Sequence, residues 1–179
     1  MKPIISVVMS VYNAESHLRS AVKSIIDQTF TDFEFIIIED GSTDNSKIIL
    51  QELANEDKRI KIIFKDKNEG TEGFIKNLNT GLKLAQGKYI ARMDADDLSL
   101  PDRFEKQLQF LEENQDVYMI GSNLELIDEN NHALRIMTAP ESNEEIKSNM
   151  LKKISMYHPV IMFRNEEKFF YREKMRYCE

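Results

Sequence analysis

Four short apolar segments, separated by amphipathic ones, constrain the fold of this chain more than any other feature. The apolar segments cover residues 4–11, 35–38, 59–64 and 89–93, and the first three are rich in the β-branched residues that favour strands. Between them, apolar residues recur at spacings of three and four, as in a helix that packs one face on a core. This alternation predicts a parallel sheet joined by right-handed crossovers.

The helices are predicted at about 18–28, 45–55, 74–85 and 101–114, with Gly87 as the C-cap of the third. After Val117 the pattern changes. It predicts strands at 119–127 and 133–137 around a turn, a polar helix at 141–153 and a short strand at 160–163. We therefore expect one α/β domain over 1–179, with a Rossmann-like, mostly parallel sheet flanked by helices and a smaller mixed C-terminal portion.

Composition narrows the class of protein. A length of 179 residues suits one ordinary domain, and a net charge of -7 argues against general nucleic-acid binding, which depends on Lys and Arg. No apolar run is long enough to cross a bilayer, and the first residues do not resemble a signal peptide. The lone cysteine, Cys178, suits a reducing cytoplasm. The basic segment 168–176 could favour an anionic membrane surface, although a solvated helix face is the simpler interpretation.

Three carboxylates, Asp94, Asp96 and Asp97, directly follow the fourth predicted strand. Acidic side chains at the carboxyl end of a strand lie where open α/β sheets bind ligands. Like charges this close need a counter-ion, and oxygen ligands of this kind suit Mg²⁺ or Mn²⁺ together with substrate phosphates. The alternative is a solvated acidic turn ahead of the helix that begins near Pro101.

Two more strand ends carry polar residues, 10–13 after the first strand and 39–42 after the second. Tyr12 could stack on a base, and Asp40 could accept the imide hydrogen of uracil, a contact that rejects bases lacking that donor. Asp96 could then bind the metal that neutralises a diphosphate. Taken singly, these residues are better explained as a half-buried tyrosine, a turn-forming Asp40 and an acidic turn. The three positions together favour a nucleotide site.

The motifs, in order, resemble those of family 2 glycosyltransferases with the GT-A fold, and the resemblance extends from Ile4 to at least Phe163. The residues that carry it are Ser6–Asn13, Ser24–Thr29, Glu39–Asp44, Asn79 with Gly81, Ala85–Ile90 and Asp94–Asp97.

The resemblance implies a metal-dependent, inverting transfer of a hexose or N-acetylhexosamine from a nucleotide sugar, most often a UDP-sugar, to a glycan or lipid-linked acceptor. The cofactor would be Mn²⁺ or Mg²⁺. Residues 1–98 would form the nucleotide-sugar-binding half, and 99–179 would begin the acceptor-side half. By motif, the donor-binding residues would be Ser10, Tyr12, Asp40, Asn79, Asp94 and Ala95, with Asp96 and Asp94 at the metal and His158 on the acceptor side.

Some expectations depart from the family pattern or go beyond it. The arginine that usually neighbours Asn79 is Leu78 here. Arg92 and Arg103 are candidates for other charge-balancing roles, although surface ion pairs are the preferred interpretation for each. The catalytic base of the family is usually acidic, and we expect it just after Glu179. Two other functions stay open: a nucleotide-sugar-binding module without catalysis, and a nucleotidyltransferase of similar fold. The resemblance also suggests polysaccharide biosynthesis at the cytoplasmic face of a membrane, by a chain that could form a homo-oligomer.

Overall fold

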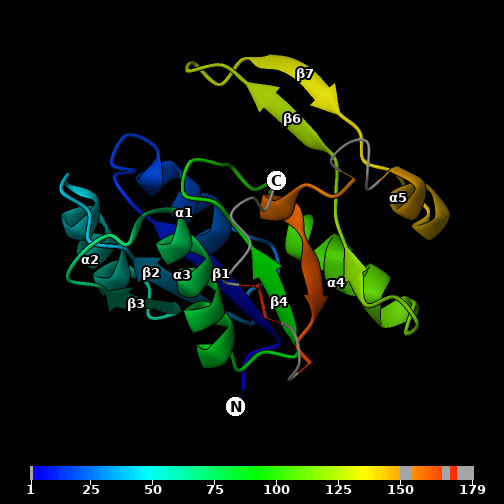
Figure 1. Cartoon of the computed structure of the whole chain (residues 1–179), viewed down its shortest axis with the longest axis horizontal. Coiled ribbons are helices and arrows are strands. Elements are labelled where there is room, and N and C mark those ends of the chain that lie inside the picture. Colours follow the sequence, from blue (N-terminus) through cyan, green and yellow to red (C-terminus); the bar gives the residue numbers. More distant parts are fainter. Residues whose placement is uncertain (1, 150–154, 167–169, 173–179) are drawn as a thin grey trace.

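A six-stranded sheet forms the centre of the computed structural model, which describes residues 2–149, 155–166 and 170–172 (Figure 1). The strand order is β3-β2-β1-β4-β8-β5. Strands β1 to β4 are parallel, whereas β8 runs antiparallel to both β4 and β5. The bounds are β1 Ile5–Val11, β2 Phe33–Glu39, β3 Ile60–Phe64, β4 Tyr89–Arg92, β5 Met119–Ile120 and β8 Met162–Arg164. The prediction of a mostly parallel α/β sheet is confirmed.

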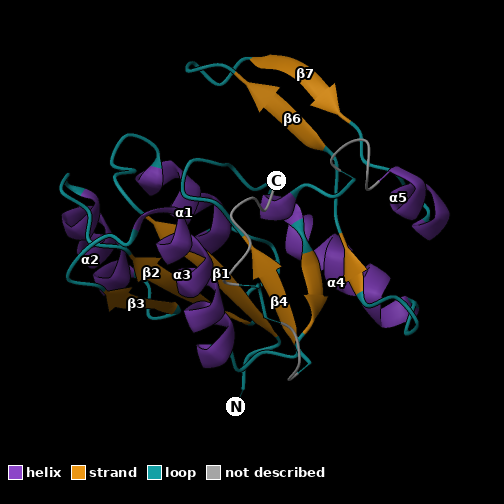
Figure 2. Cartoon of the chain, in the orientation of Figure 1, coloured by secondary structure: helices purple, strands orange, loops and turns teal. Residues whose placement is uncertain are grey.

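Helices cover both faces of this sheet (Figure 2). The longer ones are α1 Leu18–Ile26, α2 Ser46–Glu56, α3 Gly70–Leu84 and α4 Arg103–Glu113; α5 spans Asn143–Asn149 and a 3₁₀ turn spans His158–Val160. The apolar faces of α1, α2 and α4 pack on one side of the sheet, and α3 packs on the other. No helix among the described residues is long and apolar enough to span a membrane.

Successive side chains of β1 point to opposite faces of the sheet, and this explains why the helices pack on two sides. Val7 and Met9 face the α1 side, whereas Val8 faces α3 together with Ile90. A Cβ added at Gly81 of α3 would lie 2.4 Å from Val8 Cγ1, so the absence of a side chain there lets α3 lie close against the sheet.

Gly87 has a different role from the predicted one. Helix α3 ends at Leu84, and its C-cap is Ala85. A Cβ at Gly87 would lie 2.6 Å from the backbone nitrogen of Ser6, so this glycine permits close approach to β1 instead of capping the helix.

Several predicted boundaries also shift. The third helix begins at Gly70, four residues early, and the segment predicted as one strand at 119–127 divides into β5 and β6. The predicted helix at 141–153 corresponds to α5 over Asn143–Asn149, and its last residues lie outside the described chain. Cys178, Glu179 and most of the basic segment 168–176 also lie outside the described residues.

A second, two-stranded sheet projects from the main body (Figure 1). It consists of β6 Leu124–Ile127 and β7 Ala133–Met137, which pair antiparallel. Leu134 and Ile136 are 66% and 64% exposed there, in contrast to the buried side chains of β1. This hairpin is the mixed C-terminal portion that the change of pattern after Val117 predicts.

Candidate functional site

A crevice of about 550 Å³ lies at the carboxyl ends of β2, β1 and β4. Its lining includes six of the predicted site residues: Ser10, Tyr12, Asp40, Asp94, Ala95 and Asp96. They meet because these three strands are parallel neighbours, so their carboxyl ends share one edge of the sheet.

The end of β1 is held in place by the loop that follows β2. Asn13 adopts a positive φ of 49°, and its side-chain Oδ1 accepts a hydrogen bond of 2.8 Å from the Thr43 backbone. The backbone nitrogen of Asn13 donates to Ser42 Oγ at 3.0 Å. These contacts fix the strand end while leaving Tyr12 47% exposed. A half-exposed ring on a fixed backbone is suited to stacking against a planar ligand.

Asp40 is 2% exposed and compensated by two neighbours that the sequence interpretation did not include. Lys65 Nζ lies 2.7 Å from Asp40 Oδ1, and Asn68 Nδ2 donates to Oδ2 at 2.7 Å. Space is tight on the α3 side, since a Cβ at Gly73 would lie 3.2 Å from Oδ2. The carboxylate is therefore held rigidly at the base of the crevice.

Ser10 joins the same network through Asn77, which the sequence interpretation also missed. Asn77 Nδ2 donates to Ser10 Oγ at 3.0 Å, while its Oδ1 accepts from Lys65 Nζ at 3.0 Å. Asn77 is 1% exposed. An asparagine on the buried face of an amphipathic helix, two residues before Asn79, was the available signal, because a buried amide needs polar partners.

The acidic cluster after β4 is only partly compensated, because its three aspartates share two nearby arginines, Arg92 and Arg103. Asp94 pairs with Arg92 Nη2 at 2.8 Å, whereas Asp96 is exposed. Burial, together with the charges of Asp94 and Asp96, raises the pKa of Asp97 to about 6, although nearby Arg103 opposes the shift. Repulsion of this kind is relieved by a bound cation.

The oxygen donors suit a hard divalent ion, Mg²⁺ or Mn²⁺. Among the described residues, no group of three or more His, Cys, Asp and Glu side chains is arranged to hold a metal. Two carboxylates, Asp94 and Asp96, at the rim of a crevice fit an ion that is completed by ligand phosphates and water.

The two arginines beside this cluster are not surface ion-pair residues, and that interpretation is wrong. Arg92 is 0% and Arg103 8% exposed. Arg103 Nη1 donates to the carbonyls of Arg92 and Pro159, both at 3.1 Å, and so ties α4 to β4 and the 3₁₀ turn. Burial lowers the pKa of Arg103 to about 10, which leaves it charged at neutral pH.

Two predicted site residues do not line the crevice. Asn79, on α3, is 4% exposed, and its side-chain amide makes two hydrogen bonds with the backbone of Tyr171. Nδ2 donates to the Tyr171 carbonyl at 2.9 Å, and Oδ1 accepts from the Tyr171 nitrogen at 2.8 Å. His158 lies in the 3₁₀ turn between Arg92 and Tyr171. The side chains of both residues therefore bond other parts of the protein, Tyr171 in both cases and Arg92 in the case of His158.

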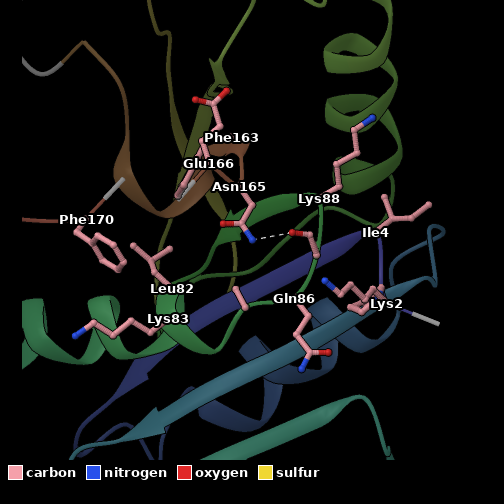
Figure 3. A pocket seen from close by; sticks show the side chains of 13 residues that line it. Lys2, Ile4, Leu82, Lys83, Gln86, Lys88, Phe163, Asn165, Glu166 and Phe170 are labelled. Carbon is pink, nitrogen blue, oxygen red and sulfur yellow. Dashed lines mark hydrogen bonds between the residues drawn. The ribbon is translucent and has the colours of Figure 1, made fainter. Parts of the chain in front are cut away.

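A second hollow, of about 810 Å³, lies at the opposite end of the strands (Figure 3). Its polar side chains include Lys2, Lys83 and Lys88, which are exposed, and one carboxylate, Glu166. Asn165 Nδ2 donates to the Gly87 carbonyl at 2.8 Å and so closes one wall. Within the described part of the chain, the lining of this hollow has neither the paired carboxylates nor the half-exposed tyrosine of the crevice.

Comparison with known proteins agrees with this geometry. The model of the family described as glycosyl transferase family 2 matches residues 6–175. The chain belongs to this family. It is 46% identical over 127 residues to an uncharacterized glycosyltransferase of Haemophilus influenzae, covering 71% of this chain and 38% of the relative. It is 39% identical over 180 residues to the uncharacterized glycosyltransferase MJ1057 of Methanocaldococcus jannaschii, covering 97% of this chain and 61% of the relative.

Solved structures similar to this family member have the same fold. Staphylococcus aureus TarS 1–349 in complex with UDP aligns with a TM-score of 0.74 at 20% identity, covering 99% of this chain and 52% of TarS 1–349. The Pyrobaculum calidifontis mannosyltransferase PcManGT, in complex with GDP-Man and Mn²⁺, aligns with a TM-score of 0.63 at 16% identity, covering 92% of this chain and 45% of PcManGT. The GT-A fold is confirmed. The chain thus spans about half the length of several proteins it matches.

Proposed function

We propose that this chain binds a nucleotide sugar and a divalent metal in the crevice, as the donor-binding part of a glycosyltransferase that inverts the sugar configuration. The observation that carries the proposal is the convergence of Tyr12, Asp40 and the Asp94–Asp96 pair on one crevice. Family membership supports it, as do the ligands of similar structures: UDP or UDP-GlcNAc for TarS and GDP-Man with Mn²⁺ for PcManGT.

In this proposal the nucleoside lies between β1 and β2. Tyr12 stacks on the base, Asp40 accepts the imide hydrogen of uracil, and Ser10 contacts the nucleoside beside them. Lys65 and Asn68 hold the Asp40 carboxylate in position for that contact. A rigid, charged acceptor discriminates strongly against bases that present no donor there.

Asp94 would face the ribose or sugar and Asp96 the metal. When bound, the divalent ion stabilises the negative charge that develops on the departing diphosphate, a contribution of several kcal/mol. Inversion also requires a base that accepts the proton of the acceptor hydroxyl on the opposite side of the sugar. The base expected after Glu179, the glycan or lipid-linked acceptor and a place at the cytoplasmic face of a membrane stay predictions.

Binding and turnover test the proposal separately. We expect UDP and UDP-N-acetylglucosamine with Mn²⁺ to raise the melting temperature more than GDP or CDP, because a ligand specific for the native state stabilises it by about 2.7 kcal/mol at 100 times its Kd. The absence of any nucleotide-dependent shift would reject the donor site. Metal-dependent binding without release of UDP in the presence of acceptor glycans would instead favour a binding module.

A further inference from the structure

The fully buried guanidinium of Arg92 is the starting point. Arg92 extends from β4 toward the α3 side, where its Cζ lies 5.9 Å from the centre of the Phe74 ring. Nη1 donates to the Val8 carbonyl at 2.7 Å, and Nη2 donates to Asp94 Oδ1 at 2.8 Å. A buried charge needs such partners, because transfer out of water without them costs several kcal/mol. Asp94 is the counter-ion.

His158 lies on the other side of the same Nη2 atom, with Nδ1 at 3.5 Å. A guanidinium has only donors, so Nδ1 must be the acceptor and the ring proton must be on Nε2. Nε2 lies 2.7 Å from the Tyr171 hydroxyl oxygen, which accepts that proton's hydrogen bond. Burial and the charge of Arg92 lower the pKa of His158 to about 3, in agreement with a neutral ring.

Tyr171 is itself anchored to α3. Its backbone nitrogen and carbonyl both bond the side chain of Asn79, at 2.8 Å and 2.9 Å. Its ring meets that of His158 edge to face, with centroids 5.2 Å apart. A continuous series of contacts therefore leads from α3 through Tyr171, His158 and Arg92 to Asp94.

We propose that Arg92 is a positioning residue of the donor site: it occupies one carboxylate oxygen of Asp94, and His158, held by Tyr171, keeps the guanidinium there. Asp94 Oδ2 alone is then left to face the donor and its metal. The inference rests on the proposed function, because it assigns these residues to the orientation of a donor–metal site. It also gives Asn79 a task, as the anchor of the segment that ends the series.

Two replacements of His158 test separately its contact with Arg92 and its contact with Tyr171. In His158→Asn, the amide oxygen takes the place of Nδ1 and can still accept from Arg92. In His158→Gln, the amide nitrogen takes the place of Nε2, so the contact with Tyr171 is kept and the acceptor facing Arg92 is lost. Calorimetry of UDP binding with and without saturating Mn²⁺, beside melting temperatures, measures both variants.

We expect His158→Gln to weaken Mn²⁺-dependent UDP binding about 10-fold and His158→Asn less than about 3-fold, in line with the effect of residues that orient metal ligands. UDP binding without Mn²⁺ should be the same in both. His132→Gln is the matched control, since His132 lies in the turn of the hairpin with its side chain 77% exposed; it should bind as the unaltered chain does.

Equal losses in the two His158 variants, or no loss in either, would overturn the inference while leaving the donor site intact. If His158→Gln fails to fold, Tyr171→Phe removes one hydroxyl from the same series. A loss of roughly 3-fold in Mn²⁺-dependent binding would then support the inference, and unchanged binding would overturn it. If the unaltered chain itself shows no Mn²⁺-dependent UDP binding, the proposed function fails first, and the two failures are distinguishable.

Discussion

The two ends of the parallel sheet both carry acidic side chains, but the negative charges are compensated to different degrees. At the amino end, Glu34 is 3% exposed and receives hydrogen bonds from Ser6 Oγ at 2.6 Å, Lys61 Nζ at 2.6 Å and the Gln86 backbone nitrogen at 2.8 Å. Burial by itself would raise the pKa of Glu34, yet these donors outweigh it and hold the pKa below 4.5.

At the carboxyl end, three carboxylates share few cations. Asp94 has Arg92, while burial and like charges raise the pKa of Asp97 to about 6. The contrast separates these two groups of acids. Glu34, whose partners all lie inside the fold, stabilises the fold, whereas the cluster after β4 has an excess of negative charge that a bound cation would relieve.

The largest expected effect comes from removing the charge that we assign to the metal. Asp96→Asn should weaken Mn²⁺-dependent UDP binding by roughly 100-fold or more, or about 2.7 kcal/mol, with little change in melting temperature because Asp96 is exposed. Calorimetry with and without Mn²⁺ measures this. The control is Asp116→Asn, an exposed acid after α4. Equal affinity in the two variants would remove Asp96 from the site.

A smaller effect is expected at the base of the crevice. Asp40→Ala should weaken UDP binding about 10- to 100-fold, since a hydrogen bond to a charged group contributes about 1.5–3 kcal/mol, and should weaken pyrophosphate binding much less. Competition assays with the two ligands test this, with Asp66→Ala as the exposed control from the loop before α3. Equal losses for both ligands would contradict a role in base recognition.

The smallest effect should appear at the amino end, and in stability instead of binding. Glu34→Gln should lower the free energy of unfolding at pH 7 by about 1–3 kcal/mol, because an amide nitrogen replaces the oxygen that accepts from Lys61 Nζ and the buried negative charge that all three donors bond is lost, and should leave UDP affinity unchanged. The folded-state pKa is lowered, so the contribution exists above pH 4.5 and disappears as pH falls through the folded-state value.

Thermal unfolding of the unaltered chain and of Glu34→Gln, from pH 7 to pH 3.5, measures the difference in their free energy of unfolding. Lys88→Gln is the control at the same end of the sheet, because the exposed pair of Lys88 with Glu112 should contribute less than about 1 kcal/mol. A Glu34→Gln difference that persisted undiminished at pH 3.5, or a loss of UDP affinity, would break the distinction between the two ends.

Most of the sheet and much of the crevice were accessible from the sequence. Strand and helix periods are local properties, and parallel strands bring their carboxyl ends together wherever they pair. Tyr12, Asp40, Asp94 and Asp96 could therefore be assigned to one edge of the sheet from their positions after strands. The family motifs added the expected ligand.

The partners of these residues could not be assigned in the same way. Asn68 is 28 residues from Asp40, and Asn77 is 67 residues from Ser10. Asn79 was expected at the donor because it matches a family motif. Its side-chain amide is instead hydrogen-bonded to Tyr171, which is 92 residues away. Motifs locate residues along a chain, whereas the direction of a side chain depends on what packs around it.

The sequence by itself determined which segments become strands and helices and which acids end the strands, since both follow from local pattern and from the geometry of a parallel sheet. Only the tertiary structure decided how the charges are compensated. An arginine at the end of an apolar strand was interpreted as a surface residue, but Arg92 is buried against Val8, Asp94 and His158. Burial and counter-ions arise from packing between distant segments, and they set the electrostatics of the site.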